Sequence, residues 1–271
     1  MTGALIAYRW ELRKLVAQKR TYLGLAAAVG VPLLFVGVLV LSEGSPDGIP
    51  FGAEVRRSGL AVPLVILLFG SIWLFPLIVS LVAGDVVATE DGHGTLKTIL
   101  TRSLDRTAIF VAKAMASATY ALVALVLMAL AAGVAGILAF GFEPLPSLSG
   151  APVPAPRALV LTVLVLGVYL MPLLAVAAIA LLLSTATRNS AAAVVATLMG
   201  SLIMQLLGIF SSLEPIQPYL LTTQFSAWLG LVREPMDWAP VGRAAWVCAL
   251  YAVPALAAGL VVFLRRDVAG G

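Results

Sequence analysis

Six long runs of uncharged, mostly apolar residues constrain this chain more than any other feature. They cover 21–42, 58–84, 114–142, 158–187, 189–213 and 244–264. A helix needs about 20 such residues to cross ~30 Å of hydrocarbon, and helices satisfy every backbone polar group inside a bilayer. Hydrophobic residues make up 61% of the chain and charged residues only 11%, a balance that a soluble domain does not have. We therefore predict an all-α integral membrane protein.

The runs predict a single transmembrane domain over 1–271 with six spans. The expected spans are about 21–42, 59–83, 110–140, 158–183, 190–212 and 244–264. Residues 213–241 contain a further uncharged stretch, 215–232, that is too polar for a confident crossing. We expect 213–241 to be extracellular or re-entrant before the sixth span. The outer connector 143–157 carries five prolines and is expected to be stiff and extended.

The first twenty residues predict a helix in the membrane interface. Leu5, Tyr8, Leu12, Leu15 and Val16 recur at helical spacing and make an apolar face. Bases fill much of the remaining surface, as is typical of a helix against anionic headgroups; they include Arg9, Arg13 and Lys14. The alternative is a charged anchor that only fixes orientation. No cleavable signal peptide is recognised.

The distribution of lysine and arginine predicts the orientation. With six spans, twelve of these bases lie on the side of both termini and of residues 84–113, and five on the other side. A seventh span would weaken the split to ten and seven. We therefore expect both termini to be cytoplasmic, in the cell membrane of a prokaryote.

Residues 84–113 form the only long charge-dense passage between spans. They hold four acids, four bases and the only histidine, His93. We expect Thr95 to cap a short helix in which Leu96, Ile99, Leu100 and Leu104 form an apolar stripe. Such a helix suits a groove on a partner protein. The alternative is a solvated connector whose charges only set topology.

Several chemistries are disfavoured by what the sequence lacks. One histidine and one cysteine exclude a multi-residue His/Cys metal site within this chain. The fourth, fifth and sixth spans carry no acid or base, which argues against proton coupling, and no nucleophile–base pair is apparent, so we predict no catalytic residue. The string G-H-G-T-L-K-T over 92–98 imitates a phosphate-binding loop, but Leu96 stands where that motif needs glycine.

The run E-D-G-H-G-T-L-K-T-I-L-T over 90–101, followed by Arg106 and Lys113, resembles the cytoplasmic loop of ABC-2 type transporter permeases. These are the membrane subunits of type V ABC exporters. The match covers about 30 residues closely and the whole plan of the chain loosely. This chain has Ser103 where the family often has proline, so the pattern leaves the end of the coupling helix undefined.

The resemblance implies that residues 84–108 form a coupling region seated on an ATPase subunit. Its matching positions are Glu90, Gly94, Thr95, Leu96 and Arg106, with Lys113 at the cytoplasmic start of the third span. The 2–20 helix would contact the same partner. Two ATPase subunits would bind ATP and Mg, whereas this chain would bind no cofactor and no nucleic acid. A second permease copy or a paralogue would complete the pore within the lipid.

The implied function is export of a hydrophobic or amphipathic substrate, such as a drug, a peptide antibiotic or a lipid. Polar residues that could face its path are Thr197, Ser201 and Gln205, although interhelical hydrogen bonding is the commoner role for such residues. The alternatives are a transporter or channel that uses no ATP and a membrane immunity or anchor component.

Overall fold

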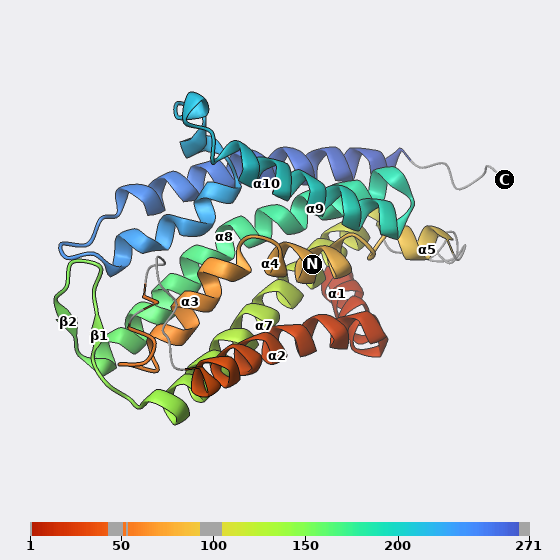
Figure 1. The fold of residues 1–271 in the computed structure, drawn as a ribbon. Helices are drawn as coiled ribbons and strands as arrows, with labels where there is room; N and C mark the ends of the chain where they lie inside the picture. Colours follow the sequence, from red (N-terminus) through yellow and green to blue (C-terminus); the bar gives the residue numbers. More distant parts are fainter. Residues whose placement is uncertain (1, 43–50, 53, 93–104, 266–271) are drawn as a thin grey trace.

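The computed structural model describes residues 2–42, 51–52, 54–92 and 105–265, and these are mostly helical. The long helices pack side by side in one bundle (Figure 1). One end of the bundle carries α5 (Ala88–Gly92) and the last described residues of the chain. The other end carries the two short strands, β1 (Leu145–Pro146) and β2 (Pro152–Val153).

Within the described residues, five helices are long and apolar enough to cross a membrane, and the count rises to six if a bent pair forms one span. The five are α2 (Lys19–Leu41), α7 (Arg106–Phe140), α8 (Ala155–Thr187), α9 (Ser190–Leu207) and α10 (Ala239–Leu264). The bent pair begins with α3 (Ala61–Gly70) and continues with α4 (Leu74–Ala83). The structure thus confirms an all-α protein with several potential membrane spans. The six spans predicted from the sequence equal the number obtained when the bent pair is counted as one span.

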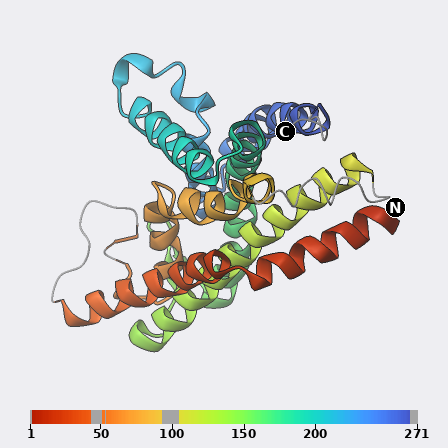
Figure 2. The same cartoon turned by 90° about the vertical axis from the view of Figure 1, so that its right-hand side faces the viewer.

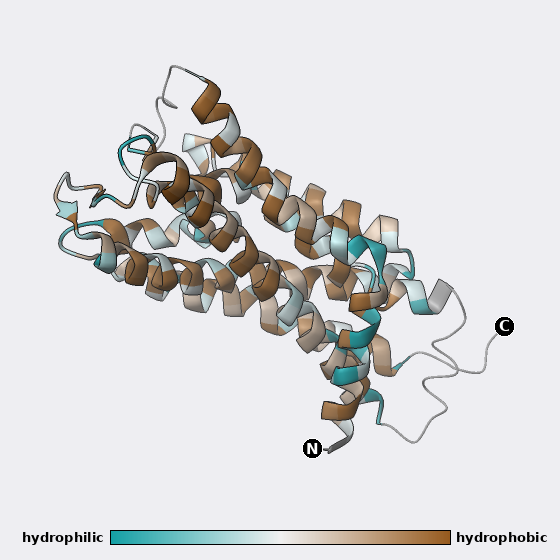
Figure 3. Ribbon diagram, turned by 90° about the horizontal axis from the view of Figure 1, so that it is seen from below, coloured by the Kyte–Doolittle hydropathy of each residue, from teal (hydrophilic) through white to brown (hydrophobic). Residues whose placement is uncertain are grey.

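Apolar side chains cover the length of the bundle on its outside. Figure 3 shows hydrophobic residues along the helices and hydrophilic residues gathered towards the ends. Leu34, Leu138 and Val163 are 71%, 81% and 68% exposed. A continuous apolar exterior of this kind is typical of a surface that faces lipid or another membrane helix.

The second predicted span is interrupted after Gly70, and the helix axes on the two sides of the break differ by 65°. Pro76 lies in the first turn of α4 and has no N–H for the carbonyl of Ile72, which favours a new helix start here. Side-chain hydroxyls donate to two carbonyls just before the break. The Tyr169 hydroxyl of α8 donates to Leu67 O (3.1 Å), and the Ser71 hydroxyl donates to Leu68 O (2.7 Å).

Small residues let α3 approach α7 closely. A Cβ atom at Gly59 would lie 2.3 Å from the backbone of Gly136, and a Cβ atom at Gly136 would lie 2.4 Å from Gly59 O. The buried side of α7 continues with alanines, including Ala116, Ala124 and Ala132. Helices in lipid associate through such close van der Waals packing.

Residues between α9 and α10 form three 3-10 segments rather than a spanning helix. They are η1 (Ser211–Leu213), η2 (Gln217–Tyr219) and η3 (Thr222–Val232). η3 packs on α8 and α10 and buries Phe225 and Trp228. The Phe225 ring contacts that of Tyr169 edge-on, with 5.0 Å between centroids. This segment lies at the end of the bundle that carries β1 and β2 (Figure 1).

The proline-rich connector forms a small antiparallel hairpin, with Leu145 opposite Val153 and Pro146 opposite Pro152. α1 (Thr2–Ala17) is separate from α2 and packs against α7. Figure 2, a view from the α5 end, shows α1 beside the first turns of α7. The fold therefore brings α1, α5 and the start of α7 together at one end.

Candidate functional site

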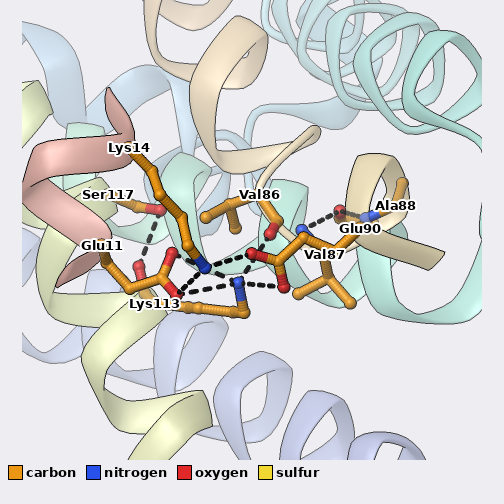
Figure 4. Close-up of polar contacts among 9 residues, drawn as sticks. Glu11, Lys14, Val86, Val87, Ala88, Glu90, Lys113 and Ser117 are labelled. Carbon is orange, nitrogen blue, oxygen red and sulfur yellow. Dashed lines mark hydrogen bonds and ion pairs between the residues drawn. The ribbon is translucent and has the colours of Figure 1, made fainter. Parts of the chain in front are cut away.

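A cluster of four charged side chains joins three segments at the α5 end of the bundle (Figure 4). It consists of Glu11 and Lys14 of α1, Glu90 of α5 and Lys113 of α7. Lys113 Nζ lies 2.7 Å from Glu90 Oε2 and 3.2 Å from Glu11 Oε1. Lys14 Nζ lies 2.6 Å from Glu90 Oε1 and 2.9 Å from Glu11 Oε1. Each base thus contacts both acids, and we call this group the charge cluster.

The charge cluster is largely closed to solvent. The side chain of Lys113 is 0% exposed and those of Glu11 and Glu90 are 6% and 13% exposed, whereas that of Lys14 is 38% exposed. Lys113 Nζ also donates to Val86 O at 3.0 Å. Removal of a buried charge from water is costly unless its partners are close and its donors are satisfied. Here two carboxylates and one carbonyl surround a single ammonium group.

Helical spacing explains how the cluster is built. Glu11 and Lys14 are three residues apart and so share one side of α1. α7 begins before the cluster, at Arg106, because the Asp105 side chain caps it by accepting from Thr107 N. Lys113 is therefore two turns inside a continuous helix, and the side chain faces α1 and the segment that leads into α5.

The two carboxylates keep Lys14 charged. Burial alone would lower the pKa of the Lys14 ammonium, but the attraction of Glu90 and Glu11 outweighs it and raises that pKa above its ordinary value of 10.5. Near neutral pH the cluster therefore holds a charged Lys14 between two acids.

A second ion pair holds the turn between α4 and α5. Asp85, 1% exposed, pairs with Arg20 at the start of α2 and accepts from the Thr89 hydroxyl. Arg20 Nη1 also lies 3.4 Å from Ser190 Oγ at the start of α9. In addition, Ser184 Oγ of α8 accepts from Ala88 N at 3.0 Å and Val87 N at 3.3 Å.

Residues 84–90 are therefore fixed to several helices at once. Ion pairs link this segment to α1, α2 and α7, and hydrogen bonds link it to α8. The segment leads directly into residues 93–104, and α7 follows them. Both flanks of residues 93–104 are thus attached to neighbouring helices by ion pairs.

The predicted coupling residues fall into three groups. Glu90 and Lys113 come together in the charge cluster, where their side chains face the protein interior. Arg106 lies at the start of α7, and its Nη1 atom donates to Leu264 O at the end of α10 (3.3 Å). Gly94, Thr95 and Leu96 lie outside the described residues, as does the predicted apolar stripe.

α1 is a helix, as predicted, but its buried side differs from the expected apolar face. Leu15 is buried and Tyr8 and Leu12 are half-buried, whereas Leu5 and Val16 are 60% and 63% exposed. The buried acid Glu11 takes part of that side because Lys113 and Lys14 neutralise its charge. Sequence reasoning missed Glu11; its signal was a single acid in a basic helix, three residues before a lysine.

The three basic residues proposed for the interfacial helix have different surroundings. Arg9 and Arg13 are exposed, and the Arg13 guanidinium lies 5.4 Å from the centre of the Trp10 ring. This distance fits a cation–π contact. Lys14, in contrast, belongs to the charge cluster.

The polar residues proposed for a substrate path lie on α9. The hydroxyls of Thr197 and Ser201 are on its buried side and donate to Ala193 O and Thr197 O, one turn earlier. This arrangement matches the commoner structural role of small polar residues in membrane helices. Gln205 is half-buried near the end of α9.

Comparison with known proteins places the chain in a family. Residues 31–269 match a family model described as "Protein of unknown function (DUF2705)". None of the curated proteins matches the chain. The matched region includes Glu90 and Lys113 and begins after α1. Because the match covers most of the chain, the chain belongs to the DUF2705 family.

Proposed function

We propose that this chain is the membrane-spanning subunit of an ATP-driven exporter of the ABC-2 type, powered by a separate ATPase subunit. The observation that carries the proposal is the charge cluster. It ties together the N-terminal helix and both flanks of residues 93–104, the segment that resembles the coupling loop of those permeases. The exporter function is inferred from the resemblance. The charge cluster supports it because its ion pairs could transmit motion from residues 93–104 to α1 and α7.

We infer that ATP-driven closure of the partner pushes on residues 93–104. Glu90 lies just before this segment and Lys113 lies two turns into the helix that follows it, and an ion pair joins them. Both also contact α1 residues. The push would therefore move α1, α5 and the start of α7 as one body, which is how packed elements transmit motion.

The arrangement of the ends supports a cytoplasmic position for this unit. Both ends of the described chain and α5 lie at the same end of the bundle (Figures 1 and 3). Twelve of the seventeen lysines and arginines belong to this end in a six-span arrangement. We infer that it faces the cytoplasm of a prokaryotic cell.

An apolar cleft supports a hydrophobic or amphipathic cargo. It has a volume of about 590 Å³ and lies between α3, α7 and α8, with side chains that include Leu60, Leu125 and Val163. The hydroxyl of Thr162, which also lines it, donates to Ala158 O within α8. The cleft therefore offers hydrocarbon contact and little polar recognition. Two ATPase copies and a second copy of this chain, or a paralogue, would form the complete exporter.

The test is purification of the tagged full-length chain from its native host, followed by reconstitution. We expect a protein with G-x-x-x-x-G-K-[ST] to co-purify in near-equal amounts, and we expect ATP hydrolysis by the complex to change when lipophilic substrates are added. Solute movement by the chain alone in liposomes would instead indicate a transporter or channel. Absence of both an ATPase partner and transport would favour an immunity or anchor role.

A further inference from the structure

We propose that a cleft at the end of the bundle opposite α5 binds a phosphate group, with Arg233 and Arg243 as its cationic ligands. The cleft has a volume of about 240 Å³ and lies between η3 and the start of α10. The ligand class is a phosphate ester, presented by a lipid headgroup or by a soluble compound. This inference requires only that the chain lies in a membrane and does not depend on the exporter function.

The cleft is lined by cationic and neutral side chains. Arg233 and Arg243 both line it, together with the hydroxyl-bearing Thr223 and Ser226 of η3. None of the described residues that line it is acidic. A fixed positive charge without a neutralising acid is what an anion site requires.

The two arginines are available to a ligand. Both are exposed, and neither forms an ion pair within the described parts of the chain. Arg56, at the same end, differs because its Nη2 atom donates to Leu39 O (2.6 Å) at the end of α2. The acid Asp237 does not line the cleft, and its Oδ1 atom accepts from Ala239 N (2.9 Å) at the start of α10.

The chemistry of the two side chains favours phosphate. A guanidinium group offers several N–H donors in a planar fork that matches two oxygens of a phosphate. The positive end of the dipole of α10 adds to this field, because Pro240 in its first turn also lines the cleft. The Thr223 hydroxyl provides a further donor.

Aromatic side chains place the cleft at the level of lipid headgroups. Trp238, Trp246 and Tyr219 are 55%, 49% and 50% exposed, and the rings of Tyr219 and Trp246 lie 5.7 Å apart. Exposed tryptophan and tyrosine are typical of the membrane–water interface. Arg243 lies between Trp238 and Trp246 on the first turns of α10. A lipid phosphate at the same level would reach the cleft without leaving the membrane.

A neighbouring cleft provides a contrast within the same structure. It has a volume of about 250 Å³ and is lined by Arg157, Arg233 and Glu234. A carboxylate beside the bases disfavours an anion there. Arg157 therefore serves as a matched control, as does the exposed Arg57 of the same end.

The experiment compares two charge-matched double variants of the full-length protein. Arg233→Gln/Arg243→Gln removes the proposed ligands, whereas Arg57→Gln/Arg157→Gln removes two charges from the same end outside the 240 Å³ cleft. Delipidated protein is titrated with phosphatidylglycerol and followed by native mass spectrometry. A parallel arm titrates inorganic phosphate and follows ³¹P line broadening. We expect the first variant to bind about tenfold more weakly and the control to bind like the unmodified protein.

Each outcome is decisive. Loss of phosphatidylglycerol binding supports the site with a lipid headgroup as ligand, and loss confined to inorganic phosphate supports it with a soluble phosphate compound. Equal binding by both double variants in both arms overturns the proposal. If the first double variant aggregates, Arg243→Lys replaces it. That change keeps the charge but removes the planar fork, so binding must still weaken, and unchanged binding again overturns the proposal.

Discussion

Lys113 Nζ lies 2.7 Å from Glu90 Oε2, and this contact joins the segments before and after residues 93–104. Glu11 of α1 contacts the same ammonium group at 3.2 Å from both of its oxygens. The charge cluster therefore holds three separate segments together at one point.

Replacement of Lys113 by methionine should be strongly destabilising. It removes the fully buried one of the two bases that Glu11 and Glu90 share and leaves these carboxylates with only the partly exposed Lys14, at a cost of about 3–5 kcal/mol. Lys14→Met should cost no more than about 1 kcal/mol, because the Lys14 side chain is 38% exposed and water screens the loss. Thermal unfolding in detergent measures both, with a Tm decrease of roughly 10 °C for Lys113→Met.

Lys19→Met is the control for this comparison. Lys19 is exposed at the start of α2 and forms no ion pair among the described residues. Its replacement should leave Tm close to that of the unmodified protein. Equal Tm values for the Lys19 and Lys113 variants would contradict a stabilising charge cluster.

Glu90 and Lys113 should be energetically coupled. In a double-mutant cycle with Glu90→Gln and Lys113→Met, the double variant should be more stable than the sum of the single losses predicts. The expected difference is about 0.5–3 kcal/mol, because each single change already removes the contact between Glu90 and Lys113, and the second change cannot remove it again. Denaturant or thermal unfolding of the four proteins measures it. Additive losses would mean that the two groups act independently.

Gly136→Ala should destabilise the packing of α3 on α7. The added Cβ atom would lie 2.4 Å from Gly59 O, so the helices must separate at a cost of about 1–3 kcal/mol. Gly133→Ala, one turn earlier, is the control because the nearest atom to its Cβ lies 3.9 Å away. The control should be neutral or slightly stabilising. Similar Tm values for the two variants would argue against the close approach.

Leu96→Asp should weaken binding of the proposed ATPase subunit. This residue belongs to the predicted apolar stripe, and a charge within an apolar contact costs at least about tenfold in affinity. Arg157→Glu, at the opposite end of the bundle, should leave co-purification unchanged. Glu90→Gln should permit assembly but lower the ATP hydrolysis linked to transport, because its side chain faces α1 and α7. Normal assembly with Leu96→Asp would contradict docking through this segment.

Hydrophobic patterning predicted the helices well because the length and apolar composition of each uncharged run are local properties of the sequence. The expected spans 158–183 and 244–264 lie within α8 and α10. The break after Gly70 was not predicted. Pro76 favours a new helix start there, but the Tyr169 hydroxyl that donates to Leu67 O beside the break lies 102 residues away in the sequence, so spacing could not reveal this contact.

The charge cluster could not be read from sequence spacing. The resemblance placed Lys113 at the cytoplasmic start of the third span, whereas it lies two turns inside a helix that begins at Arg106. Its burial depends on Glu11, 102 residues earlier in the chain. Glu90 was singled out through the resemblance, but its partners Lys14 and Lys113 became visible only in the fold.

The decisive measurement of coupling through the charge cluster is ATP hydrolysis by the purified complex in proteoliposomes. We expect the P-loop protein that co-purifies with this chain to hydrolyse ATP at a rate that responds to a lipophilic substrate. We expect Glu90→Gln to remove this response while the complex stays intact. Arg157→Glu should retain the response. If the complex lacks any ATPase, or if the response is identical in the Glu90→Gln and unmodified proteins, the charge cluster does not couple ATP hydrolysis to this chain.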